Sequence, residues 1–258
     1  MHKLSVIINS YNANQKLLSD AIDSILDQTG VKTQCIVSTV YGDPAVETSR
    51  RKRVGVVLSK KPSLYGQLNK ALRNIDGDWF FYFSGNDIAM KNKAVDEINL
   101  CIKNNKSICY SSFYKTDSNL NNKKLTKFYD YIARKHYCGN FVADVSTIKT
   151  SLLDRYAPFD ESLINAAFWD FWLRVEENEP GHFIYNDNPT WLYRIQETSR
   201  HVIRKSDKSK ILENHRQKAS MLRKHKLYLK KYSLESELTK LERSISELER
   251  EVSNAKKT

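Results

Sequence analysis

Short apolar runs and longer amphipathic segments alternate along the first half of the chain. The apolar runs, typical of strands that are buried on both faces, fall at residues 3–10, 33–40, 53–59, 79–83 and 107–114. Between them apolar residues recur every three or four positions, which predicts helices over residues 14–30, 63–78 and 92–105. Strands separated by helices of this length indicate right-handed crossovers. We therefore predict an α/β fold with a largely parallel sheet flanked by helices.

The second half of the chain has a less regular pattern. Residues 115–127 are polar and lack a period, so we expect a surface loop there. An aromatic-rich helix is predicted over 168–181, followed by strand-like residues 182–195. After Pro189 the chain contains neither glycine nor proline, which predicts that its tail forms one long helix or two.

The end of this tail carries a heptad repeat. Apolar residues alternate spacings of four and three at Leu234, Leu238, Leu241, Ile245, Leu248 and Val252. β-Branched residues at position a with leucine at position d favour a parallel dimer, but Glu237 would then face Glu242 of a twin chain, which is repulsive. The alternatives are a partner helix from another protein, or a fold-back of this acidic flank against the basic residues 208–231.

The charges divide the chain into segments. The 258 residues carry a formal net charge of +12, and the stretch from Arg200 to Lys231 is crowded with lysine and arginine. Such a basic segment indicates a polyanionic partner, either DNA or an anionic membrane surface; the alternative is a solvated helix face. We therefore divide the chain into a first domain of residues 1–199, a basic helical segment of residues 200–232 and a short coiled-coil-like helix of residues 233–258.

Several protein classes are disfavoured. The longest apolar runs are far too short to cross a bilayer, and the N-terminus has no signal-peptide pattern. The cysteines lack a CxxC pair, as is typical of reduced, buried thiols, at Cys35, Cys101, Cys109 and Cys138. We expect a cytoplasmic protein, or one that is peripheral at a membrane surface. The sequence has neither GxGxxG nor GxxxxGKS/T, which argues against dinucleotide enzymes and P-loop NTPases.

One predicted strand ends in a polar turn that is a candidate ligand-binding site. The run WFFYF stops at the small polar turn Ser84-Gly85-Asn86-Asp87, which carries one carboxylate. Ligands of parallel α/β sheets bind beyond the carboxyl ends of the strands, so Asp87 is a candidate ligand-binding residue. The alternative is a plain turn, for which Gly-Asn-Asp is also suited.

Four segments, in this order, resemble the family 2 glycosyltransferases with the GT-A fold. They are LSVIINSYNANQKLLSDAIDSILDQT (4–29), SLYGQLNKALRNIDGDWFFYFSGNDIAM (63–90), FDESLINAAFWDFWLRV (159–175) and WLYRIQETS (191–199). The resemblance covers residues 4–199 and implies the GT-A fold for that domain. It also implies transfer of a hexosyl or pentosyl group from a nucleotide-sugar donor, usually a UDP-sugar, to a hydroxyl.

The resemblance implies a metal and diphosphate site. A departing diphosphate concentrates negative charge and needs Mg²⁺ or Mn²⁺ with hard oxygen ligands. The resemblance assigns Asp87 to this ion, with Asn86 adding a carbonyl oxygen and Ser84 a hydroxyl. Arg194 is expected to contact the diphosphate. The family's metal motif usually has more acids, and Ser84 and Asn86 stand where two of them would be.

On the nucleobase side the resemblance assigns two residues. Tyr11 follows the first strand and is expected to stack on or border the base. Asp43, in VYGDP, lies after the second strand, where the family places acids that contact uridine. The acids expected directly after that strand are replaced by STVY, and Gln196 stands near the Tyr-Arg element, where the family often has histidine.

The sequence differs most from the family pattern at the expected catalytic position. Its catalytic carboxylate precedes the helix FWDFWLR, where this chain has Ala167 and Phe168. Asp170 is the nearest candidate base for the acceptor proton, although two helical positions turn it about 200° from Phe168. The alternative for Asp170 is a helix N-terminal acid that stabilises the dipole. Trp169 and Trp172 are candidates for an acceptor pocket, with core packing as the alternative.

Several functions stay open at this point. Asp170 or another acid serves as the base, or a retaining mechanism lets the leaving phosphate help to take the proton, or the chain is a non-catalytic binding or adaptor protein. The acceptor is either a modified base of DNA, as in a phage enzyme of DNA modification, or a cell-surface saccharide. The basic helix would grip DNA phosphates in the first case and rest on anionic lipid in the second.

Overall fold

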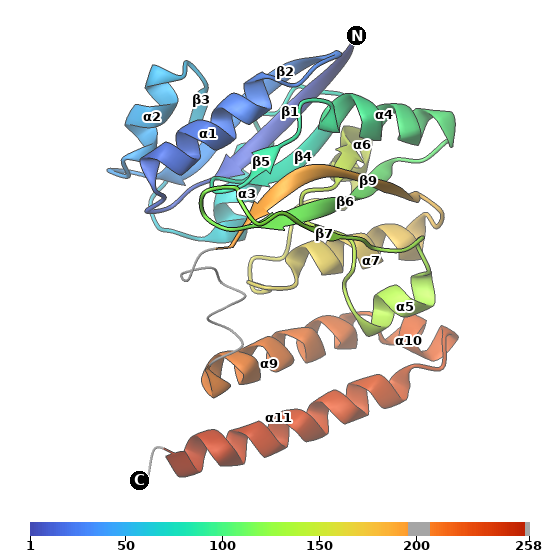
Figure 1. The fold of residues 1–258 in the computed structure, drawn as a ribbon. Coiled ribbons are helices and arrows are strands. Elements are labelled where there is room, and N and C mark those ends of the chain that lie inside the picture. The colour runs from blue at the N-terminus through green and yellow to red at the C-terminus, as the bar shows by residue number, and fades with distance from the viewer. Residues whose placement is uncertain (196–206, 256–258) are drawn as a thin grey trace.

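The computed structural model describes residues 1–195 and 207–255 and centres on one sheet (Figure 1). In these residues the strands follow the order β3-β2-β1-β4-β8-β6-β9-β5, with β7 beside β6. They are β1 (His2–Asn9), β2 (Val31–Val40), β3 (Gly55–Ser59), β4 (Trp79–Ser84), β5 (Ile88–Ala89), β6 (Ile108–Thr116), β7 (Lys124–Thr126), β8 (Thr147–Lys149) and β9 (Phe183–Arg194). The pairs β3–β2, β2–β1, β1–β4 and β6–β9 are parallel, whereas β8 runs antiparallel between β4 and β6. The predicted α/β fold with a mostly parallel sheet is confirmed.

Helices cover both faces of the sheet (Figure 1). They are α1 (Gln15–Leu26), α2 (Ala45–Arg51), α3 (Leu64–Leu72), α4 (Lys93–Lys103), α5 (Ala133–Cys138), α6 (Thr150–Tyr156) and α7 (Ala167–Asn178). Buried residues of α1 and α4 share one hydrophobic cluster with Val6 and Phe81, and those of α3, α6 and α7 share another with Ile7 and Phe80. Neighbouring strand residues therefore point to two equally buried faces, which explains why the strands are unbroken apolar runs.

Side-chain caps fix the start of two predicted helices. The Ser63 hydroxyl accepts the Gly66 N–H at 3.1 Å at the start of α3. The Asn14 side chain accepts the N–H groups of Lys16 and Leu17 at 3.0 and 3.3 Å at the start of α1. These bonds satisfy N–H groups that have no partner within the helix. The caps thus place both helix starts directly after the ends of strands β1 and β3.

The segment expected to be a loop at residues 115–127 contains a short strand. β7 pairs antiparallel with β6, and Leu125 lies opposite Tyr114. Asp117 Oδ1 accepts the N–H groups of Asn119 and Asn121, both at 2.9 Å, which closes the turn between the strands. The loop prediction is wrong for β7. A strand of three residues is too short to show an alternating pattern in the sequence, and β7 is recognisable only from its pairing with β6.

The tail forms three helices in the described residues rather than one or two. They are α9 (Lys208–Lys224), α10 (Lys226–Lys231) and α11 (Glu235–Ala255). The first break falls at His225, and the second at Ser233, which has φ of 53°. Neither residue breaks helices in the way that glycine or proline does, so these breaks could not be predicted from local signals.

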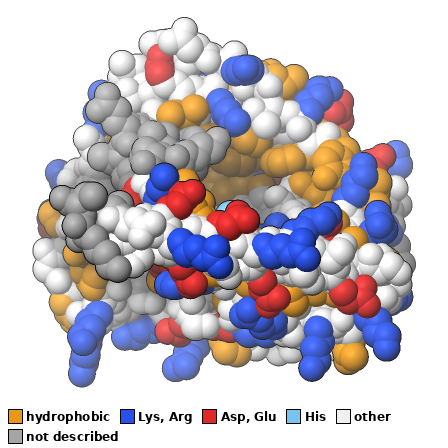
Figure 2. Space-filling view, turned by 90° about the horizontal axis from the view of Figure 1, so that it is seen from below, with side chains coloured by type: hydrophobic (Ala, Val, Ile, Leu, Met, Phe, Trp, Pro, Cys, Tyr) orange, Lys and Arg blue, Asp and Glu red, His pale blue; other side chains and the backbone are white. Residues whose placement is uncertain are grey.

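Helices α9 and α11 lie side by side as a hairpin (Figure 1). Three ion pairs join them, at 3.0, 2.6 and 2.7 Å: Lys208–Glu251, Arg216–Glu249 and Arg223–Glu242. Leu234 and Leu241 of the heptad seam are buried within the chain. The structure therefore has the fold-back arrangement, in which the acidic flank lies against basic α9. Figure 2 shows basic and acidic side chains mixed along this face.

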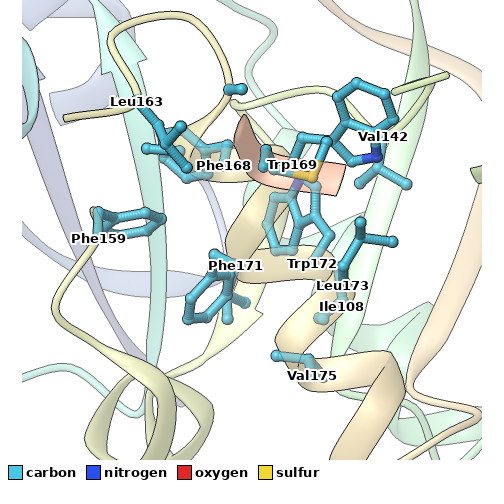
Figure 3. Packing of buried hydrophobic residues seen from close by; sticks show 14 of the residues in the cluster. Ile108, Val142, Phe159, Leu163, Phe168, Trp169, Phe171, Trp172, Leu173 and Val175 are labelled. Atoms are coloured by element: carbon cyan, nitrogen blue, oxygen red, sulfur yellow. The ribbon is translucent and has the colours of Figure 1, made fainter. Parts of the chain in front are cut away.

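The hairpin packs on the sheet domain. Met221, Leu222 and Leu229 belong to the same hydrophobic cluster as the aromatic residues of α7. Figure 3 shows Phe168, Phe171 and Trp172 of α7 inside that cluster. No helix among residues 1–195 and 207–255 is long and apolar enough to cross a membrane. Gln196 and residues 200–206 of the basic segment lie outside the described residues.

Candidate functional site

A cleft of about 990 Å³ lies at the carboxyl ends of β1 and β4. Its walls come from the loop after β1, the start of α3, the turn after β4, the loop before α7 and the end of β9. Among the sequence candidates, Tyr11, Asn86, Asp87 and Arg194 line it, together with Ser84. Crossover connections bring these distant segments to one sheet edge, where α/β proteins bind ligands.

Asp87 is the buried acid of the cleft, with 3% of its surface exposed. Its Oδ1 accepts the backbone N–H of Arg194 at 3.0 Å. Burial raises the pKa of Asp87 to about 7, although the hydrogen bond and the charge of Arg194 act in the opposite direction. The carboxyl group therefore titrates near neutral pH.

Arg194 brings a buried positive charge to the cleft, with 3% of its surface exposed. Its Nη2 donates to Asp20 Oδ2 of α1 at 3.1 Å. Within the described residues Nε and Nη1 have no hydrogen-bond partner. Because an unpartnered buried guanidinium donor is unfavourable, the site is suited to an anion that accepts these two bonds.

Three more cleft residues carry buried polar atoms without a partner in the described part of the chain. They are Oδ1 of Asn9, Oγ of Ser10 and Nε1 of Trp191. The Asn9 amide group is fixed because its Nδ2 donates to Leu64 O at 2.7 Å. These three residues were not among the candidates predicted from the sequence, although Asn9 and Ser10 end the first predicted strand as Ser84 ends the fourth. A polar ligand would satisfy several of these atoms at once.

Tyr11 and Asp43, the two residues expected to contact the nucleobase, differ in exposure and in their relation to the cleft. Tyr11 is 52% exposed and lines the cleft. Asp43 is buried and does not line it; its Oδ2 accepts the Asn12 N–H and its Oδ1 the Ala45 N–H, both at 2.8 Å. Asn12 has φ of 49°, so Asp43 holds a left-handed turn beside Tyr11. Asp43 thereby supports the loop that presents Tyr11.

The residues expected to hold a metal offer few strong ligands. No group of three or more His, Cys, Asp or Glu in the described residues could hold a metal ion. Asp87 contributes one carboxylate, and Ser84 and Asn86 contribute neutral oxygens. Mg²⁺ commonly binds one or two carboxylates together with substrate phosphates. The residues present therefore fit a divalent ion whose remaining oxygen ligands come from a diphosphate, and not a cage made by the protein alone.

An aromatic layer surrounds Phe168, the position at which the sequence resemblance leads us to expect a catalytic carboxylate. Phe168 is 2% exposed, and its ring centroid lies 4.5 Å from that of Phe159 (Figure 3). The ring centroids of Tyr65 and Tyr82 lie 6.0 and 5.5 Å from that of Phe168. Tyr65 and Tyr82 line the cleft. This wall of the cleft is therefore backed by aromatic rings rather than by a base.

The structure does not bring Asp170 to the cleft. Its Oδ2 accepts Arg174 Nε at 2.9 Å, and its Oδ1 lies 3.2 Å from His225 Nε2. Burial by itself would raise the pKa of Asp170, but the hydrogen bond from His225 and the charge of Arg174 outweigh it and hold the pKa below its usual value. Asp170 thus joins α7 to the hairpin.

Trp169 and Trp172 lie in the core beside the cleft rather than in its wall. Trp169 Nε1 donates to His136 O at 2.8 Å, and Trp172 is fully buried. Neither residue lines the cleft. Figure 3 shows both among the hydrophobic side chains of the cluster.

The loop before α7 places a different acid at the cleft. Glu161 lines it, and its Oε1 accepts Asn69 Nδ2 at 3.1 Å. Asp144 lines the cleft as well. In the sequence, FDES is more typical of a turn and cap than of a catalytic acid, because nothing local in it signals a cleft.

Helix α9 holds this same loop in place. The Asn165 N–H donates to Gln217 Oε1 at 2.9 Å, and the Asn165 side chain donates to Asn214. Lys224 forms an ion pair with Asp160 at the start of the loop. Because Asn165 lines the cleft, α9 fixes one wall of it.

Comparison with known proteins gives consistent matches in sequence and in fold. The profile of Glycosyl transferase family 2 matches residues 5–173. The uncharacterized glycosyltransferase MJ1057 of Methanocaldococcus jannaschii is 24% identical over an alignment of 190 residues, and the match covers 68% of this chain and 65% of that protein. The chain thus spans somewhat less than two thirds of this relative.

Two solved structures share the fold. S. aureus TarS 1-349 in complex with UDP-GlcNAc matches with a TM-score of 0.65 and 17% identity, over 85% of this chain and 66% of that one. Glucosyl-3-phosphoglycerate synthase from Mycobacterium tuberculosis, in complex with Mn²⁺, UDP and glucosyl-3-phosphoglycerate, matches with a TM-score of 0.55 and 14% identity, over 83% and 80%.

Proposed function

The chain belongs to glycosyl transferase family 2 and has the GT-A fold, and on this premise we propose that it transfers a sugar from a nucleotide-sugar donor to an acceptor hydroxyl. The observation that carries the proposal is the buried guanidinium of Arg194, which has two unpartnered donors at the cleft. A UDP-sugar is the first donor to test, because the TarS structure contains UDP-GlcNAc and the mycobacterial synthase structure contains UDP. The transferred group would be a hexosyl or pentosyl group.

Arg194 would bind the diphosphate of the donor through Nε and Nη1. Guanidinium groups form short, charge-assisted hydrogen bonds with phosphate oxygens. Asp20 accepts the third donor, Nη2, and so fixes the plane of the guanidinium before the ligand arrives. Tyr11 would border the nucleobase, on a loop that Asp43 holds.

Asp87 would hold Mn²⁺ or Mg²⁺ through its carboxylate, with Ser84 and Asn86 nearby. Such an ion, when bound, would neutralise charge on the departing diphosphate. Asp87 must be deprotonated to act as a ligand, and its pKa of about 7 makes this step dependent on pH. Its Oδ1 stays on the Arg194 N–H and keeps the carboxylate oriented.

We place Glu161 ahead of Asp170 as the group that takes the acceptor proton. Glu161 is a solvent-exposed carboxylate at the cleft, held by Asn69. Asp170 is committed to Arg174 and His225 and would have to leave both to act as a base. An acceptor site on Trp169 and Trp172 would likewise require the core to open, since both are buried.

For the acceptor, the hairpin favours a cell-surface saccharide over modified bases of DNA. Three basic residues of α9 are paired with glutamates of α11, which leaves less charge for DNA phosphates. A second candidate function is non-catalytic binding of a nucleotide sugar. It is favoured by one observation, the aromatic Phe168 at the position of the family's base.

Calorimetric titration with UDP and a set of UDP-sugars, with and without Mn²⁺, tests the donor site. We expect binding by the unmodified chain and a loss of about tenfold or more in Arg194→Gln. Arg50→Gln, which removes the same charge from an exposed site, should bind normally. If the folded chain binds no nucleotide sugar, the transferase proposal is wrong. If it binds donors but releases no UDP with any acceptor, the non-catalytic function holds.

A further inference from the structure

Helix α10 presents an outward face that combines basic and apolar side chains. Leu229 points inward and is buried, and the ring of Tyr228 stacks on that of Tyr137 with centroids 6.1 Å apart. The remaining residues of the helix, Lys226, Leu227, Lys230 and Lys231, are exposed. Leu227 is 74% exposed, more than any other large hydrophobic residue of the described chain except Met1.

Helix α5 extends this surface. Arg134 Nε donates to Tyr232 O at 3.5 Å and so joins the two helices. Ile132 and Tyr129, beside α5, are 43% and 44% exposed, and Lys135 lies over the Tyr129 ring at 4.8 Å. We name the surface formed by Tyr129, Ile132, Arg134, Lys135 and the four exposed residues of α10 the α5–α10 corner. Figure 2 shows hydrophobic side chains beside lysine and arginine toward the right of this face.

Two lysines of the α5–α10 corner are left unpaired, in contrast to the charges of α9. Among the described residues Lys226 and Lys230 have no ion pair, whereas Lys208, Arg216 and Arg223 of α9 are each paired with a glutamate. Elsewhere in the corner the charges of Arg134 and Lys231 act on Glu237 and Glu176. The unpaired positive charge is therefore that of Lys226 and Lys230, at one end of the hairpin.

We propose that the α5–α10 corner binds the surface of an anionic lipid bilayer. Lysines attract acidic headgroups, and exposed leucine, isoleucine and tyrosine side chains gain by entering the boundary of the acyl region. A DNA duplex would use the lysines but would gain nothing from Leu227. This inference stands independently of the proposed transfer reaction.

Helix α9 contacts the loop before α7 along its length. Asn214 and Gln217 contact Asn165, and Lys224, two positions before Lys226, pairs with Asp160. A membrane bound at the corner would thus lie next to the loop that forms one wall of the cleft.

Flotation of the full chain with vesicles tests the proposal. We expect the chain to float with phosphatidylcholine vesicles that contain about 30 mol% phosphatidylglycerol as the anionic lipid. It should not float with vesicles of phosphatidylcholine alone. Lys226→Gln with Lys230→Gln should weaken binding by about 25-fold, at about fivefold for each lysine. Leu227→Ser should weaken it by about tenfold.

The matched control is Lys60→Gln with Lys61→Gln, which removes the same charge from exposed positions elsewhere. It should bind vesicles like the unmodified chain. If this control weakens binding as much as the corner variant does, net charge alone is responsible and the proposal is wrong. Two results together would also overturn the proposal in favour of nucleic acid. They are weaker binding of a DNA duplex by the double lysine variant and unchanged vesicle binding by Leu227→Ser.

Discussion

Asp87 accepts the backbone N–H of Arg194 through Oδ1 at 3.0 Å, although the two residues lie 107 positions apart. This bond joins the turn after β4 to the end of β9 at the cleft. It also couples the residue expected to hold a metal to the residue expected to hold the diphosphate. A change at either residue should therefore affect the other.

The pH dependence of stability should reveal the titration of Asp87. Burial raises its pKa from 3.8 to about 7 in the folded chain. A group whose pKa is raised by folding stabilises the fold fully below its unfolded pKa, and this contribution is lost as the pH rises to the folded value. Between pH 5 and pH 8 the free energy of unfolding of the unmodified chain should therefore fall by about 1–3 kcal/mol relative to that of Asp87→Asn. Urea denaturation at both pH values measures this difference, and parallel curves for the two proteins would contradict it.

Substitution of Gln217 should affect turnover of the acceptor and not binding of the donor. Its Oε1 accepts the N–H of Asn165, a residue of the cleft wall. Gln217→Ala should lower the turnover of the acceptor by about fivefold to tenfold, because the wall loses its orientation, and leave UDP affinity unchanged within about twofold. Ser220→Ala, an exposed change on the same helix, is the control. If Gln217→Ala loses UDP affinity by as large a factor as it loses turnover, Gln217 does not act on the acceptor side alone and the prediction is wrong.

His225 should make the docking of the hairpin dependent on pH. Its Nδ1 lies 2.7 Å from Glu177 Oε1, and its Nε2 lies 3.2 Å from Asp170 Oδ1. Burial alone would lower the pKa of His225, but these two carboxylates raise it above its usual value. The contribution to stability is therefore complete below about pH 6 and lost as the pH rises through the raised pKa.

The test compares His225→Gln with the unmodified chain at pH 6 and pH 9. The variant should be less stable by about 1–3 kcal/mol at pH 6 and by less at pH 9. His215→Gln on α9 is the control, because burial lowers the pKa of His215 and predicts the opposite trend. A deficit of His225→Gln that is the same at both pH values would speak against a charged imidazole.

A fully buried ion pair should control the stability of the sheet and not the cleft. Lys93 Nζ lies 2.8 Å from both carboxylate oxygens of Glu97, and neither side chain is exposed. Glu97 also accepts hydrogen bonds from three hydroxyl groups, those of Ser111, Thr147 and Thr190. Lys93→Met leaves the carboxylate uncompensated and should cost about 3–5 kcal/mol.

The double variant Lys93→Met with Glu97→Gln should recover most of that loss, because no buried charge remains. Urea denaturation of the single and double variants completes a cycle that isolates the pair. UDP binding should be unchanged in whichever variant stays folded, since neither residue lines the cleft. A double variant as unstable as Lys93→Met would contradict the electrostatic explanation.

Much of the sheet domain could be predicted because its signals are local. The run WFFYF is apolar at every position, since β4 is covered on both faces, and Ser63 marks the start of α3 by its own hydrogen bond. The short elements β7, α5 and α10 could not be predicted in the same way. Each is too short to show a period and is defined by the segment that packs on it.

Local patterns along the chain predict the main strands and helices of residues 3–114 and the place of Asp87 at a strand end, because each depends on residues that are close together in sequence. The contact of Arg194 with Asp87, the contact of Asp170 with His225 and the place of Glu161 at the cleft arise only when the chain is folded. The same holds for the pairing of α11 glutamates with basic residues of α9. These relationships join residues far apart in sequence, and burial and charge pairing select them only when the whole chain packs.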